Sequence, residues 1–130
     1  MRDELQNDIF TEKFLAQLYR RAAALAPNQT ERNALLQFSD NATRNAEYLN
    51  HFYRQEFGTN YDPLIPDVNI QGTYQDVLNE IQKQELESFL RIRRNTYFQQ
   101  DSELKDTMRF IADVKLGHIL TILSIVANME

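Results

Sequence analysis

The sequence predicts an all-α fold, an antiparallel four-helix bundle with a long crossover between its second and third helices. Apolar residues recur at steps of three and four along four segments, which is the spacing of one helix face. Few residues separate the first helix from the second and the third from the fourth, so each pair is expected to be antiparallel. The middle connection, residues 59–72, has no helical period and contains Pro63 and Pro66, which indicates a crossover along the bundle.

The helix ends are marked by residues that start or stop helices. Pro27 blocks continuation of the first helix, and Asn28 and Thr30 offer capping oxygens for the second. Gly58 suits the position just after the second helix, and Ser102 is expected to cap the fourth. We expect the whole chain, residues 1–130, to form a single domain whose helices span about 3–26, 29–57, 73–100 and 102–129.

Each helix carries one row of residues that should face the interior. The rows are Leu5, Asp8, Glu12, Leu15, Tyr19 and Ala22; Leu35, Phe38, Ala42, Asn45, Leu49 and Phe52; Tyr74, Leu78, Ile81, Glu85, Ser88 and Ile92; and Leu104, Met108, Ile111, Lys115, His118, Ile122, Ile125 and Met129. The fourth row is apolar except for Lys115 and His118, one turn apart at its middle. Because an unpaired ammonium in an apolar interior is costly, carboxylates must face it.

The two halves of the chain repeat each other without a gap. A shift of 73 residues carries the rows of the first two helices onto those of the last two. At the polar positions the shift takes Glu12 to Glu85, Ala42 to Lys115 and Asn45 to His118. Two glutamates in register at otherwise apolar positions favour a true repeat over chance periodicity.

In each half, a glutamate is followed 30 and 33 residues later by two positions one turn apart. This spacing resembles the ferritin-like superfamily, and most closely its rubrerythrin-like branch. Local likenesses are Tyr19 seven residues after Glu12, the run 46–49 with Tyr53, and Gly58 before the crossover. The resemblance implies that two helices each supply one glutamate and the other two each supply Glu-x-x-His, which together hold two iron or manganese ions.

Carried onto this chain, the family's ligand set is incomplete. Glu12 and Glu85 stand at the single-glutamate positions, and His118 is the one histidine that remains. Ala42 and Asn45 replace both ligands of the second helix, and Lys115 replaces the glutamate of the fourth. Two divalent ions need several anionic oxygen donors, and a lysine repels them. The resemblance therefore implies a degenerate di-metal site with three vestigial ligand positions, and no cofactor is expected.

The substitutions suggest that an ion-pair network replaces the metals. Lys115 would neutralise Glu12 and Glu85, while Asn45 and His118 would supply hydrogen bonds to the carboxylates. Three alternatives stay open at this point. A partial metal site could use Glu85, His118 and a further donor, the register could be wrong, or the polar residues could reach solvent at an opening in the bundle.

The function expected first is therefore that of a structural or binding protein which has lost di-iron chemistry. The alternative is a rubrerythrin-like di-iron or di-manganese oxidoreductase or metal-storage protein with an atypical or partial site. A third reading is a partner-binding module that uses Tyr61, Leu64 and Ile65 of the crossover. No catalytic residue is assigned, because the sequence contains no phosphate-binding loop or nucleophile–base motif.

The composition of the chain bears on its binding partners and its location. The net charge is −5 with both signs interspersed, which does not indicate a nucleic-acid surface. There is no cysteine, which excludes disulfides and thiolate metal sites, and no signal peptide or long apolar run indicates a membrane protein. We expect a cytoplasmic protein. Leu116, Leu120 and Leu123 form a second apolar face on the fourth helix, which favours a homodimer.

Other candidate residues receive structural explanations. Glu47 and His51 lie off the inward row and are expected to form a surface pair. The remaining expectations are rim carboxylates at Asp40 and Asp113, a solvated basic face at Arg91, Arg93 and Arg94, and an aromatic stripe for core or subunit contacts at Tyr48, Phe52, Tyr53 and Phe57.

Overall fold

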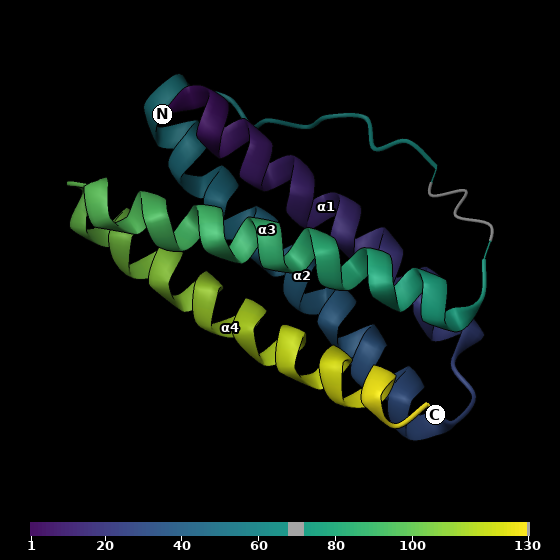
Figure 1. Cartoon of the computed structure of the whole chain (residues 1–130). Coiled ribbons are helices and arrows are strands. Elements are labelled where there is room, and N and C mark those ends of the chain that lie inside the picture. Colours follow the sequence, from purple (N-terminus) through teal and green to yellow (C-terminus); the bar gives the residue numbers. More distant parts are fainter. Residues whose placement is uncertain (68–71, 130) are drawn as a thin grey trace.

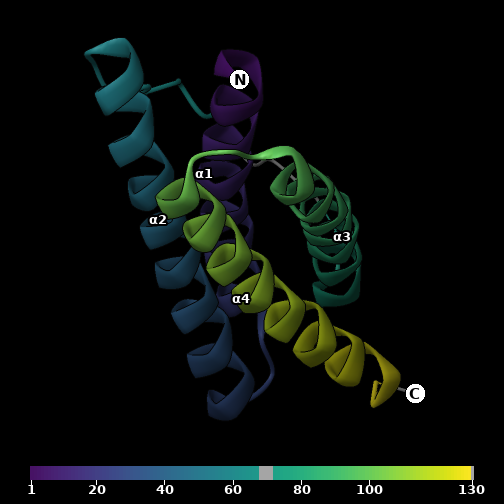
Figure 2. The same ribbon diagram turned by 90° about the vertical axis from the view of Figure 1, so that its left-hand side faces the viewer.

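A computed structural model describes residues 1–67 and 72–129, and that part of the chain consists of four α-helices without a strand. The helices are α1 (Arg2–Leu25), α2 (Gln29–Phe57), α3 (Tyr74–Phe98) and α4 (Ser102–Ala127). They form a four-helix bundle in which α1 packs against α2 and α3, and α4 packs against α3 and α2 (Figures 1 and 2). The all-helical class is confirmed, although α3 and α4 each end two residues before the expected boundary.

The helix ends show which capping predictions were right. The Asn28 side chain accepts the Glu31 amide at the start of α2, and Gly58 ends that helix with a left-handed φ of 81°. The prediction for Ser102 was wrong. Ser102 is the first helical residue of α4, and the carboxylate of Asp101 before it accepts two backbone amides of the first turn.

The connection between α2 and α3 begins at the end of the bundle near the N-terminus of the chain, and α3 starts at the opposite end (Figure 1). Asn50 of α2 holds its beginning, because the Asn50 amide donates to the Tyr61 carbonyl at 3.0 Å and its oxygen accepts the Tyr61 N–H at 2.8 Å. Lys13 of α1 pairs with Asp62 at 3.3 Å. Leu64 is 96% exposed, and residues 68–71 of the expected crossover lie outside the described residues.

The core consists of two apolar clusters. One lies around Tyr19, Leu35 and Ile81, and the other around Ile9, Leu49 and Ile111. Each inward row contributes residues to both clusters. On α1 and α4, the polar residues of the row lie between the row residues that belong to the first cluster and those that belong to the second. One expected row was too long, because Met129 lies beyond the end of α4 and is 40% exposed.

The outer face of α4 has no partner helix within the described part of the chain. Leu120 and Leu123 are 58% and 56% exposed, and Leu116 is also exposed. Toward its C-terminal end α4 diverges from α2 (Figure 2). Among the described helices, only α4 has the length and the apolar composition needed to cross a membrane. The core helix of a water-soluble protein can have the same length and composition.

Candidate functional site

The ammonium group of Lys115 lies between two carboxylates in the middle of the bundle. Its Nζ is 2.5 Å from Glu12 Oε2 and 2.7 Å from Glu85 Oε1. The three side chains come from α4, α1 and α3, and none is more than 1% exposed. Each reaches this point because it occupies the inward row of its helix, where the neighbouring row members are also buried. We call these residues, with Asn45, His118 and Tyr19, the polar layer.

The remaining carboxylate oxygens of the polar layer also accept hydrogen bonds. The Asn45 amide donates to Glu12 Oε1 at 2.8 Å. The Tyr19 hydroxyl donates to Glu85 Oε2 at 2.5 Å, and His118 Nδ1 lies 2.8 Å from the same oxygen. Glu12 therefore has two donors and Glu85 has three, so no carboxylate oxygen of the layer is left without a partner, as buried charges require.

His118 is held on both ring nitrogens. Its Nε2 lies 3.1 Å from the side-chain nitrogen of Asn41, which donates when the ring carries its proton on Nδ1. That proton is donated to Glu85. The ring also stacks on Phe38 with centroids 4.1 Å apart and meets the edge of Tyr19 at 5.4 Å. These contacts fix the orientation of the imidazole toward the polar layer.

The two carboxyls differ in acidity although they share one lysine. Burial raises the pKa of Glu12, and this effect together with the nearby Glu85 charge outweighs the attraction of Lys115. Burial also acts to raise the pKa of Glu85, but Lys115 and His118 together lower it to about 2. Burial acts to lower the pKa of Lys115, yet the two carboxylates outweigh it and raise this pKa. The lysine is therefore charged, and Glu12 is the first carboxyl to take up a proton.

The polar layer does not fit a two-metal centre. The ammonium of Lys115 occupies hydrogen-bonding positions on both Glu12 and Glu85, where a divalent ion would need the same oxygens. Ala42 is buried in the adjoining apolar cluster and supplies no donor from its side chain. Within residues 1–67 and 72–129, no three His, Asp or Glu side chains are grouped so that they could hold a metal ion.

A second ion pair, between the buried Asp8 and the partly exposed Arg91, was not predicted from the sequence. Arg91, expected on a solvated face, donates from Nε to Asp8 Oδ1 at 3.0 Å. Burial raises the pKa of Asp8 against the opposing effect of Arg91. The signal was present in the sequence, because Asp8 is itself a polar member of an inward row and requires a cation. The hydrogen bonds of Tyr19 and Asn41 to the polar layer were likewise missed.

The other candidate side chains lie outside the polar layer. Glu47, His51, Asp40 and Asp113 are all exposed on the helices. The aromatic stripe is divided between interior and surface. Tyr53 is buried against Phe57 and Tyr61, whereas Tyr48 is largely exposed and packs edge-on against Phe110 of α4.

Comparisons of the chain with protein-family models, with curated proteins and with solved structures found no match. The function must therefore be inferred from the residues of the chain itself. The polar layer around Lys115 is chemically the most informative feature, because it concentrates five titratable side chains in one small volume. They are Glu12, Tyr19, Glu85, Lys115 and His118.

Proposed function

We propose that this chain is a ferritin-like antiparallel four-helix bundle which has lost di-metal chemistry and acts as a structural or binding protein. The observation that carries the proposal is the contact of one buried ammonium, Lys115 Nζ, with both Glu12 and Glu85. In this account the lysine supplies the positive charge that two metal ions supply in the related proteins. The fold then keeps its polar layer without a metal.

The sequence repeat supports a ferritin-like origin. Glu12 and Glu85 are equivalent under the repeat, and both are buried against the same lysine. Asn45 and His118 are also equivalent under it, and each donates to the glutamate of its own half. Such a pattern is what two duplicated helix pairs would retain after the loss of bridging glutamates at positions 42 and 115.

The surroundings of the polar layer favour a structural role over turnover. Every residue of the layer is buried, and the cavity beside it, between α2 and α4, holds only about 50 Å³. Sites for small-molecule ligands usually have volumes of about 300–1,000 Å³. The cavity is lined by Asn41 and by Asn45 of the layer, and it has no room for an organic substrate.

The proposal predicts that protein purified without chelators holds no stoichiometric iron, manganese or zinc, as measured by elemental analysis of the intact chain. The combined variant Ala42→Glu, Asn45→His and Lys115→Glu is the matched positive control. It should bind divalent metal, because it restores the four anionic and two imidazole donors of the related sites. Close to two metals per parent chain, bound through Glu12, Glu85 and His118, would overturn the proposal in favour of an oxidoreductase or storage protein.

We further propose that the chain assembles as a homodimer through the exposed faces of α3 and α4. Gln82 of α3 donates to the Ile119 carbonyl of α4 at 3.2 Å, which places the middle parts of these helices side by side. The exposed leucines on them are Leu86, Leu90, Leu116, Leu120 and Leu123. A neighbouring groove contains Arg93, Arg109 and Asp113, so the rim carries both charge signs. A second copy of the same surface supplies the complementary charges.

Leu120→Glu is expected to convert the dimer into a monomer of about 15.4 kDa, because it places a carboxylate in the middle of a desolvated interface. The measurement is light scattering coupled to size-exclusion chromatography. Leu64→Glu is the control, since Leu64 is more exposed than Leu120 and lies in the connection away from this face. A parent protein that is monomeric at every concentration tested would contradict the assembly.

A further inference from the structure

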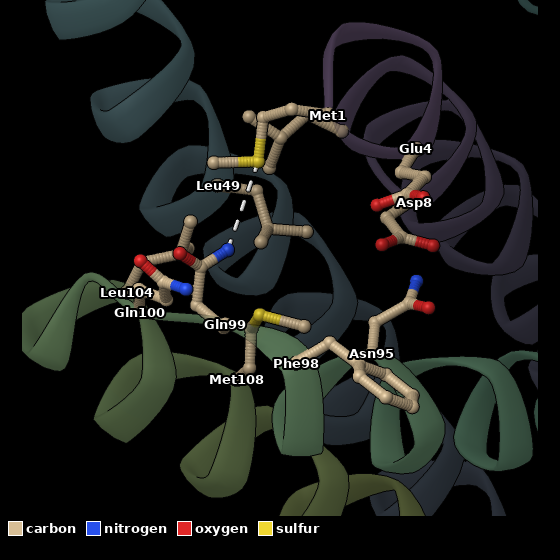
Figure 3. Close-up of a pocket in the computed structure, with 11 residues that line it drawn as sticks. Met1, Glu4, Asp8, Leu49, Asn95, Phe98, Gln99, Gln100, Leu104 and Met108 are labelled. Atoms are coloured by element: carbon tan, nitrogen blue, oxygen red, sulfur yellow. Dashed lines mark hydrogen bonds between the residues drawn. The ribbon is translucent and has the colours of Figure 1, made fainter.

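A cavity of about 420 Å³ lies at the end of the bundle where α1 starts, α3 ends and α4 starts. Its apolar lining comes from buried side chains on three helices, Leu5, Leu49, Leu104 and Met108. Two carboxylates of α1, Glu4 and Asp8, lie next to each other on one wall and face Asn95 of α3 (Figure 3). The cavity therefore combines an apolar floor with an acidic wall.

Among the side chains, the acidic wall carries one negative charge in excess. Met1 also lines the cavity, but its α-ammonium group forms no ion pair with Glu4 or Asp8. Asp8 is only 3% exposed, and Arg91 engages its Oδ1 at 3.0 Å. Among the described residues, no donor forms a hydrogen bond to its other oxygen, Oδ2, which is not fully buried and is therefore open to a further donor. Glu4, one turn earlier on the same face of α1, forms no ion pair with a described residue. Arg91 thus pairs with Asp8 alone, and the Glu4 carboxylate has no cationic side chain of its own among the described residues.

We propose that this cavity binds a small organic monocation, a primary ammonium attached to an alkyl or arylalkyl group. The ammonium lies between Asp8 Oδ2 and Glu4, where it supplies the missing positive charge and donates hydrogen bonds. The apolar part lies against Leu49 and Met108. The volume is within the usual range of about 300–1,000 Å³ for small-molecule sites. The site is separate from the polar layer and does not depend on the function proposed for it.

The charge of the wall sets the specificity of the site. An anion of the same shape would be repelled by two carboxylates, and a neutral alcohol would leave the excess charge unbalanced. Benzylammonium and benzyl alcohol have closely similar shapes and differ in charge. Comparing their affinities therefore distinguishes the contribution of the acidic wall from that of the apolar floor. The polar layer takes no part in this binding, since none of its residues lines the cavity and each of its carboxylate oxygens already has a donor.

The test is isothermal titration calorimetry of the full chain with benzylammonium and with benzyl alcohol, accompanied by NMR of the Met108 and Leu49 methyl groups to locate the ligand. Benzylammonium should bind about tenfold more tightly than the alcohol or better, as one charge-assisted contact provides. Asp8→Asn should weaken benzylammonium binding by about tenfold or more and leave benzyl alcohol unaffected.

Two variants keep the test valid if Asp8→Asn fails to fold. Glu4→Gln changes an exposed side chain and should weaken benzylammonium binding by about threefold or more. Asp3→Asn removes a neighbouring exposed carboxylate that does not line the cavity, and it should bind like the parent. Three results would each overturn the proposal: no binding of benzylammonium by the parent, equal binding of the alcohol, or equal loss with Glu4→Gln and Asp3→Asn.

Discussion

Lys115→Met is expected to lower the free energy of unfolding at neutral pH by about 3–5 kcal/mol, the usual cost of removing one partner from a buried ion pair. The variant leaves Glu12 and Glu85 facing each other without a counter-ion, and both are at most 1% exposed. Methionine fills much of the lysine volume, so a cavity contributes little to the loss. The control is Lys83→Met, which removes an exposed lysine of α3 and should change stability by less than about 0.5 kcal/mol.

Two processes should soften the loss, and each has a signature in thermal unfolding. Glu12 already has a raised pKa because of burial, and without the lysine it takes up a proton more readily. The deficit of the variant should therefore shrink as the pH falls from neutral to mildly acidic. A divalent ion could also replace the lost charge, so added manganese should raise the melting temperature of Lys115→Met and leave that of the parent unchanged.

Glu85 should make the parent protein sensitive to acid. Its pKa is lowered from 4.5 to about 2 in the folded chain, because Lys115 and His118 together outweigh the opposing effect of burial. The unfolded chain therefore binds the proton first as the pH falls. The stability that Glu85 contributes is fully present above about pH 4.5 and is lost between there and pH 2, a loss of about 3 kcal/mol.

Urea unfolding between pH 2 and pH 7 measures this loss. Glu85→Gln, which cannot titrate, should reduce the dependence on pH below 4.5, whereas Glu87→Gln, an exposed neighbour on α3, should keep the parental dependence. Glu12 acts in the opposite sense, because its pKa is raised in the folded chain. The stability that Glu12 contributes therefore falls as the pH rises above the ordinary pKa of a glutamate. If Glu85→Gln keeps the full acid-induced loss of the parent, the carboxylate is not stabilised as described.

The ion-pair contacts of the polar layer could be predicted from the sequence, because a buried charge needs a partner of opposite charge. A lysine in the middle of an apolar row requires anionic partners, and the glutamates on the other inward rows are Glu12 and Glu85. Helical periodicity places all three side chains inside the bundle. The structure brings them into contact, with Lys115 Nζ 2.5 Å and 2.7 Å from the two carboxylates.

Periodicity was less informative about long side chains outside the inward rows. Arg91 lies one position before the inward-facing Ile92, and it reaches Asp8 because its flexible stem bends toward the interior. Asn41 contacts His118 from a position next to the inward row of α2. The spacing of apolar residues shows which face of a helix is buried, but it does not show which rotamer a residue beside that face adopts. The cavity at Asp8 could not be predicted for the same reason, since three helix ends form it.

The coupling between Lys115 and the two carboxylates tests the ion-pair account most directly. The measurement compares the unfolding free energies of the parent, Lys115→Met, the double variant Glu12→Gln with Glu85→Gln, and the triple variant that combines all three changes. We predict that the single and the double variant are each strongly destabilised, and that the triple variant recovers much of the loss because its layer is uncharged. A contradiction would be a Lys115→Met protein as stable as the parent, or a triple variant whose loss equals the sum of the other two.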